Sequence, residues 1–111
     1  MSKKKSSSNA QTIQRLSYEE YGISKNRLAE LQSGCRAGIY PSEMLSDACN
    51  GFEFVKPWIL LSVAKNRSYD LLEFDLRLGR VPVGRSNFYS FRRRFFYNLD
   101  RALRENGSSR T

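Results

Sequence analysis

The stretch that decides the fold is SNFYSFRRRFFYNLDRALRE, residues 86–105. At the spacing of about 100° per residue of an α-helix, its apolar side chains fall within an arc of about 140°. These side chains are Phe88, Phe91, Phe95, Phe96, Leu99, Ala102 and Leu103. The opposite side collects Ser86, Asn87, Ser90, Arg93, Arg94, Tyr97, Arg101 and Arg104. The stretch therefore predicts a long amphipathic helix with one face in the core. Arg92 falls inside the apolar arc, so we expect its stem to pack and its charged head to reach the surface.

The chain before this stretch is divided into short apolar segments by turn residues. The segments predict four more helices: one capped by Ser24 that ends near Gly34 or Gly38, one that begins at Tyr40-Pro41-Ser42 and stops at Gly51, one over residues 58–66, and one capped by Ser68 over residues 69–78. Residues 52–55 could form a short extended piece, but one strand cannot form a sheet. The fold class we expect is therefore all-α, a small bundle of about five helices.

The length of 111 residues suits a single domain. We place this domain at residues 13–105, where an apolar lead-in should pack on the core. The lead-in contains Leu16, Tyr18, Tyr21 and Ile23. Residues 1–12 (MSKKKSSSNAQT) lack aromatic side chains and cannot offset the entropy of ordering, so we expect a disordered basic tail. We also expect residues 106–111 to form a flexible end.

The net charge of +8 is distributed unevenly along the chain. Residues 1–40 carry +4, residues 41–76 carry −3 and residues 77–111 carry +7. All nine basic residues of the last segment are arginines, whose planar fork matches phosphates and guanine edges. Asp100 and Glu105 cannot neutralise the six arginines from Arg92 to Arg110. The excess therefore predicts a nucleic-acid surface rather than a helix balanced by its own ion pairs.

The composition argues against catalysis. The chain has no histidine, which excludes a histidine general base, a Ser-His or Cys-His nucleophile pair and a histidine metal ligand. Two groups of acids could in principle hold Mg²⁺, Glu43, Asp47 and Glu53 or Asp70, Glu73 and Asp75, and their spacing places some of them on shared helix faces. Such faces are common on protein surfaces, so they do not by themselves predict a magnesium site. No glycine-rich phosphate loop is present. We therefore expect that the protein is not an enzyme and has no catalytic residue, no cofactor and no metal.

The cysteines and the apolar runs also narrow the class. Cys35 and Cys49 are too few for a disulfide framework, and we expect two small reduced core residues, with a labile disulfide as the alternative. No apolar run reaches the roughly 18–20 residues of a membrane span. The basic start of the chain is not followed by the apolar segment of a secretory signal. We therefore expect a cytoplasmic protein without a membrane partner.

The helix over residues 68–78, the VPVG turn at residues 81–84 and the arginine-rich helix have the order of a helix-turn-helix unit over residues 68–105. The string VPVGRSNFYSFRRRFFYNLDRAL, residues 81–103, resembles the C-terminal end of ArpU/RinA-type phage and prophage proteins. The string YGISKNRLAEL, residues 21–31, resembles the start of small prophage proteins of the same kind. The resemblance implies a transcriptional regulator whose helix-turn-helix is similar to region four of bacterial sigma factors.

The resemblance also implies which residues contact DNA. By position, Ser86, Asn87, Tyr89, Ser90, Arg93 and Arg94 would occupy the DNA-facing start of the recognition helix. Tyr97 is a further contact candidate on the polar side of this helix. We expect phosphate contacts from Arg80, Arg85, Arg92, Arg101 and Arg104. The turn before the helix is longer than the usual 3–4 residues.

The resulting hypothesis is sequence-specific binding of double-stranded DNA by a phage or prophage transcriptional regulator that uses residues 86–105 as its recognition helix. Its partners would be duplex DNA, RNA polymerase and a second copy of the chain, on the nucleoid of a bacterial host cell. Two alternatives stay open. The chain could be a helical interaction or assembly subunit of a phage whose basic face meets an acidic protein, or an arginine-rich RNA-binding protein.

Overall fold

The computed structural model describes residues 15–74 and 78–110, with side chains as far as Glu105. The predicted tail at residues 1–12 lies outside this part of the chain, as do the side chains of the predicted flexible end. The described elements are α2 (Lys25–Ala37), α3 (Ser42–Asp47), the 3₁₀ helix η2 (Glu53–Val55), α4 (Lys56–Lys65), α5 (Tyr69–Glu73) and α6 (Arg85–Arg110). No strand occurs in these residues, and the all-α prediction is confirmed.

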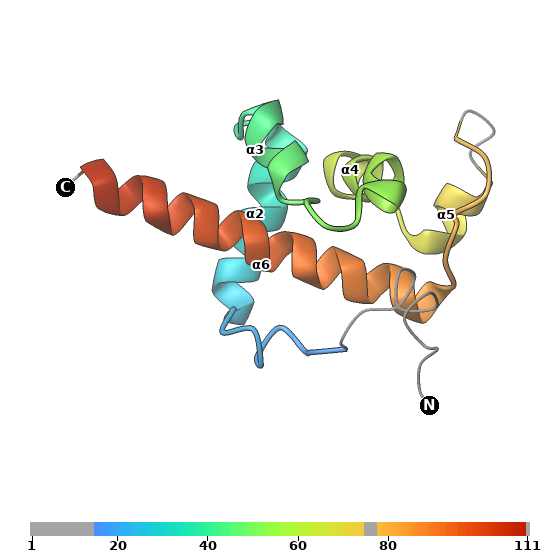
Figure 1. Ribbon diagram of the computed structural model, residues 1–111, viewed down its shortest axis with the longest axis horizontal. Helices are drawn as coiled ribbons and strands as arrows, with labels where there is room; N and C mark the ends of the chain where they lie inside the picture. Colours follow the sequence, from blue (N-terminus) through green and yellow to red (C-terminus); the bar gives the residue numbers. More distant parts are fainter. Residues whose placement is uncertain (1–14, 75–77, 111) are drawn as a thin grey trace.

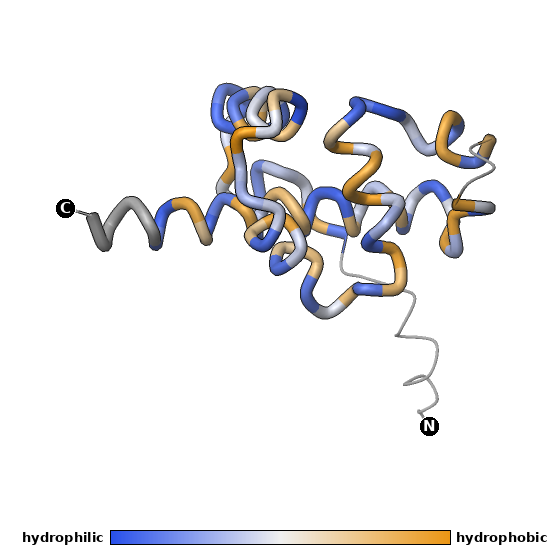
Figure 2. Tube along the Cα trace, turned by 90° about the horizontal axis from the view of Figure 1, so that it is seen from above, coloured by the Kyte–Doolittle hydropathy of each residue, from blue (hydrophilic) through white to orange (hydrophobic). Residues whose placement is uncertain are grey.

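Helix α6 is the axis of the bundle. It runs along the longest dimension of the molecule, with α3, α4 and α5 on one side and α2 crossing it (Figure 1). The predicted aromatic face forms the centre of the core: Phe88, Phe91, Phe95, Phe96 and Leu99 are buried. Ala102 and Leu103, at the end of the same face, are only half-buried. Short runs of hydrophobic and hydrophilic residues follow one another along α6 (Figure 2), as the period of about 3.6 residues in an amphipathic helix requires.

The helix caps follow the sequence closely. The Ser24 hydroxyl accepts a hydrogen bond from the backbone N–H of Arg27, and the Ser68 hydroxyl accepts one from Leu71. Of the two glycines that could end the first helix, Gly38 does so, in the left-handed conformation that favours glycine. Gly34 lies inside α2, where a Cβ atom would come within 2.5 Å of the Tyr40 ring.

Several helix ends differ from the sequence prediction. The piece at residues 52–55 ends in the 3₁₀ helix η2, which leads directly into α4. Helix α5 ends at Glu73, whose carboxylate accepts a hydrogen bond from the Val81 backbone N–H at 2.8 Å and so fixes the end of the following connection. Helix α6 begins at Arg85 and continues to Arg110, beyond the predicted end. The connection from Phe74 to Gly84 has 11 residues, where a helix-turn-helix usually has a turn of roughly 3–4.

The predicted apolar lead-in packs on the core. Ile23 is buried, and the Tyr18 ring lies 6.4 Å from the Phe96 ring, measured between centroids. Cys35 and Cys49 are buried and free, which confirms two reduced core residues. The lead-in therefore covers one side of α6.

Candidate nucleic-acid interface

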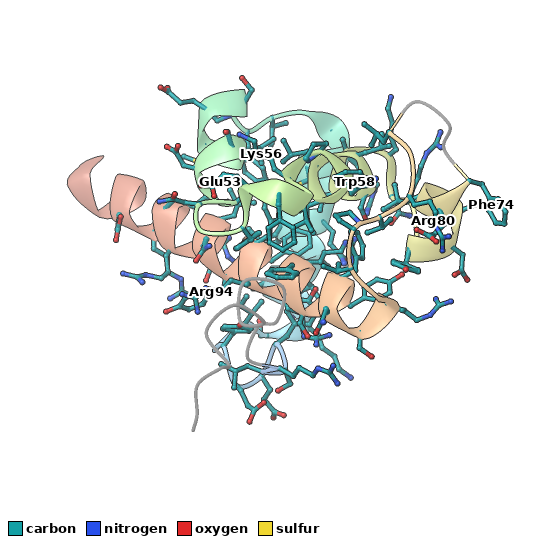
Figure 3. All side chains as sticks on the ribbon, turned by 45° about the vertical axis from the view of Figure 1, so that its right-hand side comes forward. Glu53, Lys56, Trp58, Phe74, Arg80 and Arg94 are labelled. Carbon is teal, nitrogen blue, oxygen red and sulfur yellow. The ribbon has the colours of Figure 1, made fainter. Side chains whose placement is uncertain are left out.

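Two arginines and an asparagine lie along one line of α6, and the two arginines are open to solvent. Asn87, Arg94 and Arg101 recur every seven residues, which returns a helix to nearly the same face and spaces them about 10 Å apart along the axis. Arg94 and Arg101 are exposed, and Asn87 is half-buried. Arg94 lies on the opposite side of α6 from Lys56 (Figure 3). We call Asn87, Arg94 and Arg101 the outer stripe.

The two arginines of the outer stripe share an aromatic support. The guanidinium carbon of Arg94 lies 5.3 Å from the centroid of the Tyr97 ring, and that of Arg101 lies 5.7 Å from it. The Tyr21 ring packs on the same tyrosine at 4.9 Å. Cation–π contacts of this kind restrict the side chains without neutralising them. Tyr97, predicted as a DNA contact, therefore serves first to hold the two charges close together.

A polar hollow of about 420 Å³ lies beside the outer stripe. It is lined by Asp47, Asn50, Arg94, Asn98, Arg101, Ala102 and Glu105. The Asn98 amide donates a hydrogen bond to the Ala48 carbonyl at 2.9 Å, which ties this part of α6 to the end of α3. Asp47 and Glu105 disfavour an anion in the hollow itself. The Arg94 end of the outer stripe is therefore the better place for a phosphate.

The three consecutive arginines point in three directions. Arg92 packs over Phe96 at 5.3 Å, and its Nε atom is buried without a hydrogen-bond partner in the described part of the chain. Arg93 donates from Nε to the Leu16 carbonyl at 2.8 Å. Arg94 alone of the three is exposed. The sequence placed Arg93 and Arg94 side by side on one DNA-facing surface, but the lead-in occupies the Arg93 guanidinium.

Two predicted DNA contacts, buried Ser90 and half-buried Tyr89, make hydrogen bonds within the fold. Ser90 is 1% exposed; its hydroxyl donates to the Ser86 carbonyl at 3.0 Å and accepts from Arg93. The Tyr89 hydroxyl accepts a hydrogen bond from the backbone N–H of Tyr69 at 3.0 Å, and so joins α5 to α6. Helical periodicity could not reveal that the lead-in covers one of these positions and α5 the other. The prediction that Ser90 contacts DNA is therefore wrong, because its hydroxyl is buried and bonded on both sides, while the Tyr89 hydroxyl already accepts a bond from α5.

Arg80 and Arg85 lie at the corner between α5 and α6, and both have acidic partners. Arg85 pairs with Asp70 at 2.5 Å and packs over the Tyr69 ring, and hydrogen bonding to Asp70 raises the pKa of its guanidinium. Arg80 pairs with Glu73 at 3.4 Å. The charge balance drawn from residues 77–111 missed these acids because they come from α5. Exposed Ser86 adds a hydroxyl at the first turn of α6, which contains no acid.

The carboxylate of Asp100 joins two helices, a role that the sequence did not predict. Asp100 is 4% exposed. Its two carboxylate oxygens accept hydrogen bonds from Arg27 Nε at 2.6 Å and from Arg104 Nε at 3.0 Å. Arg104, a predicted phosphate contact, is therefore held by a carboxylate. The sequence feature that could have indicated this ion pair is Arg27, a basic residue on α2, the helix that crosses α6.

The described residues contain no cluster of histidine, cysteine or acidic side chains that could hold a metal ion. Among the helices of the described part, none is both long enough and apolar enough to cross a membrane. In comparisons with protein-family models, curated proteins and solved structures, nothing matched this chain.

Proposed function

We propose that the protein binds double-stranded DNA, with the outer stripe of α6 against the phosphate backbone. The observation that carries the proposal is the pair of exposed guanidiniums, Arg94 and Arg101, held over one tyrosine ring on the open side of a long helix. The two guanidinium carbons are at most about 11 Å apart, and duplex DNA presents one phosphate charge per roughly 1.7 Å of its axis. Both arginines can therefore meet phosphates of one duplex.

The electrostatics of the outer stripe support an anionic partner. Arg94 makes no ion pair with a described carboxylate. The pair between Arg101 and Glu105 is 3.8 Å long and exposed, and such pairs contribute only about 0–1 kcal/mol. A phosphate can replace this partner at little cost. Arg104, in contrast, would have to leave the buried carboxylate of Asp100.

The first turn of α6 supports the finer proposal that binding is sequence-specific. Ser86 is exposed there, and half-buried Asn87 accepts a long hydrogen bond of 3.4 Å from Arg15. Side chains of these two types hydrogen-bond base edges and phosphates. An α-helix fits the major groove of about 12 Å. Together with the resemblance to ArpU/RinA-type regulators, this supports α6 as the recognition helix of a phage or prophage transcriptional regulator. RNA polymerase and a place on the bacterial nucleoid belong to the same proposal.

The test is binding of the full chain to a labelled random-sequence duplex at low salt. The Arg94→Ala/Arg101→Ala variant should bind at least about tenfold more weakly, because it loses two phosphate contacts. The matched control, Arg36→Ala/Lys65→Ala, removes the same charge from exposed positions on α2 and α4 and should change affinity much less. Equal losses in both variants would mean that only net charge matters and would remove the outer stripe from the proposal.

Two further outcomes distinguish the other partner classes. A structured RNA that displaces the duplex at equal concentration would favour the arginine-rich RNA-binding alternative. No shift with any nucleic acid at low salt would favour the helical interaction or assembly subunit, whose basic face meets an acidic protein.

A further inference from the structure

An exposed apolar surface lies at the α5 end of the molecule. Phe74 is 80% exposed and Leu71 is 55% exposed. Phe74 projects outward from the end of α5 (Figure 3). Burial of a large apolar side chain is favourable in water, so two exposed ones near each other in the chain favour a partner that covers them. Exposed apolar side chains that gather in one place are typical of contact sites.

An apolar hollow lies at the same end. It has a volume of about 410 Å³ and is lined by Pro57, Leu60, Leu61 and Leu78. Leu78 belongs to the same connection as Phe74, and the next residue in that connection, Gly79, is fixed by a hydrogen bond from Trp58 Nε1 to its carbonyl at 3.3 Å. The α5 end of the molecule thus carries both a projecting aromatic ring and a hollow with apolar walls. We call Leu71, Phe74 and this hollow the α5 surface.

The charges around the α5 surface identify the kind of partner that suits it. Among the described residues they include two pairs of opposite sign: Asp70 with Arg85, both exposed, and exposed Arg80 with Glu73, whose side chain is 19% exposed. A nucleic acid gains little at a locally neutral surface, and an acidic protein is attracted more strongly by the unpaired arginine of the outer stripe. Two copies with a charge of +8 each repel one another least where their charges are compensated. Acids and bases at one rim can also exchange partners with a copy related by a two-fold axis.

We propose that a second copy of this chain docks on the α5 surface in a two-fold symmetric dimer, with Phe74 of each chain entering the hollow of the other. A two-fold interface must be self-complementary, and a surface with both a projection and a hollow meets this requirement. A dimer interface of standard size takes about 800 Å² from each partner, about a tenth of the 6989 Å² surface of one chain. A patch of that size takes in the apolar side chains and the two flanking ion pairs. The outer stripe stays open in this dimer.

The experiment is sedimentation velocity of the full chain from micromolar to millimolar concentration. We expect a monomer–dimer equilibrium for the native chain and a dissociation constant raised at least about 30-fold by Phe74→Ser, the loss typical of a central aromatic anchor. The matched control is Ile39→Ser, which removes another apolar side chain, 67% exposed, from the connection between α2 and α3. This control should dimerise like the native chain. A native chain that stays monomeric at millimolar concentration overturns the proposal, as does equal weakening by both variants.

A second variant tests the hollow. Pro57 is exposed at the first turn of α4, where an acidic residue favours the helix, so Pro57→Glu should fold normally while placing a charge in the hollow. It should weaken the dimer as strongly as Phe74→Ser. A dimer that tolerates Pro57→Glu would contradict entry of Phe74 into the hollow. Neither result depends on DNA binding, so this proposal and the proposed function fail separately.

Discussion

Asp100 fixes the crossing of α2 and α6 because its carboxylate serves one arginine from each helix. A buried carboxylate with two charge-assisted hydrogen bonds is stable only while both partners are present. Replacing Asp100 by Ala removes the carboxylate that accepts a hydrogen bond from Arg27, whose side chain is only 30% exposed. We expect the free energy of unfolding to fall by about 3 kcal/mol, measured by urea denaturation. Glu105→Gln, at an exposed acid on the same helix, is the control and should change it by less than about 0.5 kcal/mol.

The two cysteines are protected by burial. Burial raises the pKa of the Cys35 thiol to about 11 and that of the Cys49 thiol to about 12. Both thiols stay protonated at pH 8, so a thiol reagent should modify the native protein at least about 100-fold more slowly than the unfolded chain. A Ser33→Cys variant adds an exposed thiol on α2 as an internal control. Native cysteines that react as fast as this added thiol would contradict the burial.

The same shifts predict how stability depends on pH. A thiol whose pKa is raised in the folded state stabilises the fold fully below its unfolded pKa and loses this contribution as pH rises through the folded value. The free energy of unfolding should therefore fall between pH 9.0, the ordinary value, and pH 11 to 12. Denaturation curves across this range should show a smaller fall in a Cys49→Ala variant, which no longer has the more shifted thiol.

At the scale of the element, the start of α6 is fixed by hydrogen bonds to α5 and to the connection before it. The Tyr89 hydroxyl accepts from the Tyr69 backbone, and the Tyr69 hydroxyl donates to the Val83 carbonyl at 3.1 Å. Tyr89→Phe should lower the free energy of unfolding by about 1 kcal/mol and leave DNA affinity unchanged. A loss of affinity without a loss of stability would instead support the sequence-based placement of Tyr89 on the DNA. Denaturation and duplex titration of the same preparation separate the two results.

The sequence predicted which face of α6 is buried because Phe88, Phe95 and Leu99 follow helical periodicity. It also predicted the caps at Ser24 and Ser68, since capping is decided by neighbours in the chain. Periodicity cannot tell how much of the polar side other segments cover. Arg93 bonds to Leu16 of the lead-in and Asp100 to Arg27 of α2, and these partners are 77 and 73 residues away in the sequence. The sequence predicted that a broad polar side of α6 faces DNA. The structure leaves the outer stripe as the candidate surface.

At the scale of the whole molecule, the structure divides the +8 charge into regions of different character. The arginines at the α5–α6 corner are balanced by Asp70 and Glu73, and Arg27 and Arg104 share a buried carboxylate. The outer stripe keeps an exposed arginine without an acidic partner among the described residues. The molecule thus offers a basic line along α6 and a neutral apolar surface at its α5 end. In the two proposals, the outer stripe binds the DNA phosphates and the α5 surface binds the second copy of the chain.

The most direct test of the central claim is the salt dependence of duplex binding, measured by fluorescence anisotropy for the native chain and for Arg94→Ala/Arg101→Ala. Each phosphate contact contributes about 0.9 to the slope of log affinity against log salt. The account predicts that the double variant lowers the magnitude of the slope by about 1.8, while Arg36→Ala/Lys65→Ala leaves the slope nearly unchanged. A native slope near zero, or the same slope in all three proteins, would contradict phosphate binding by the outer stripe.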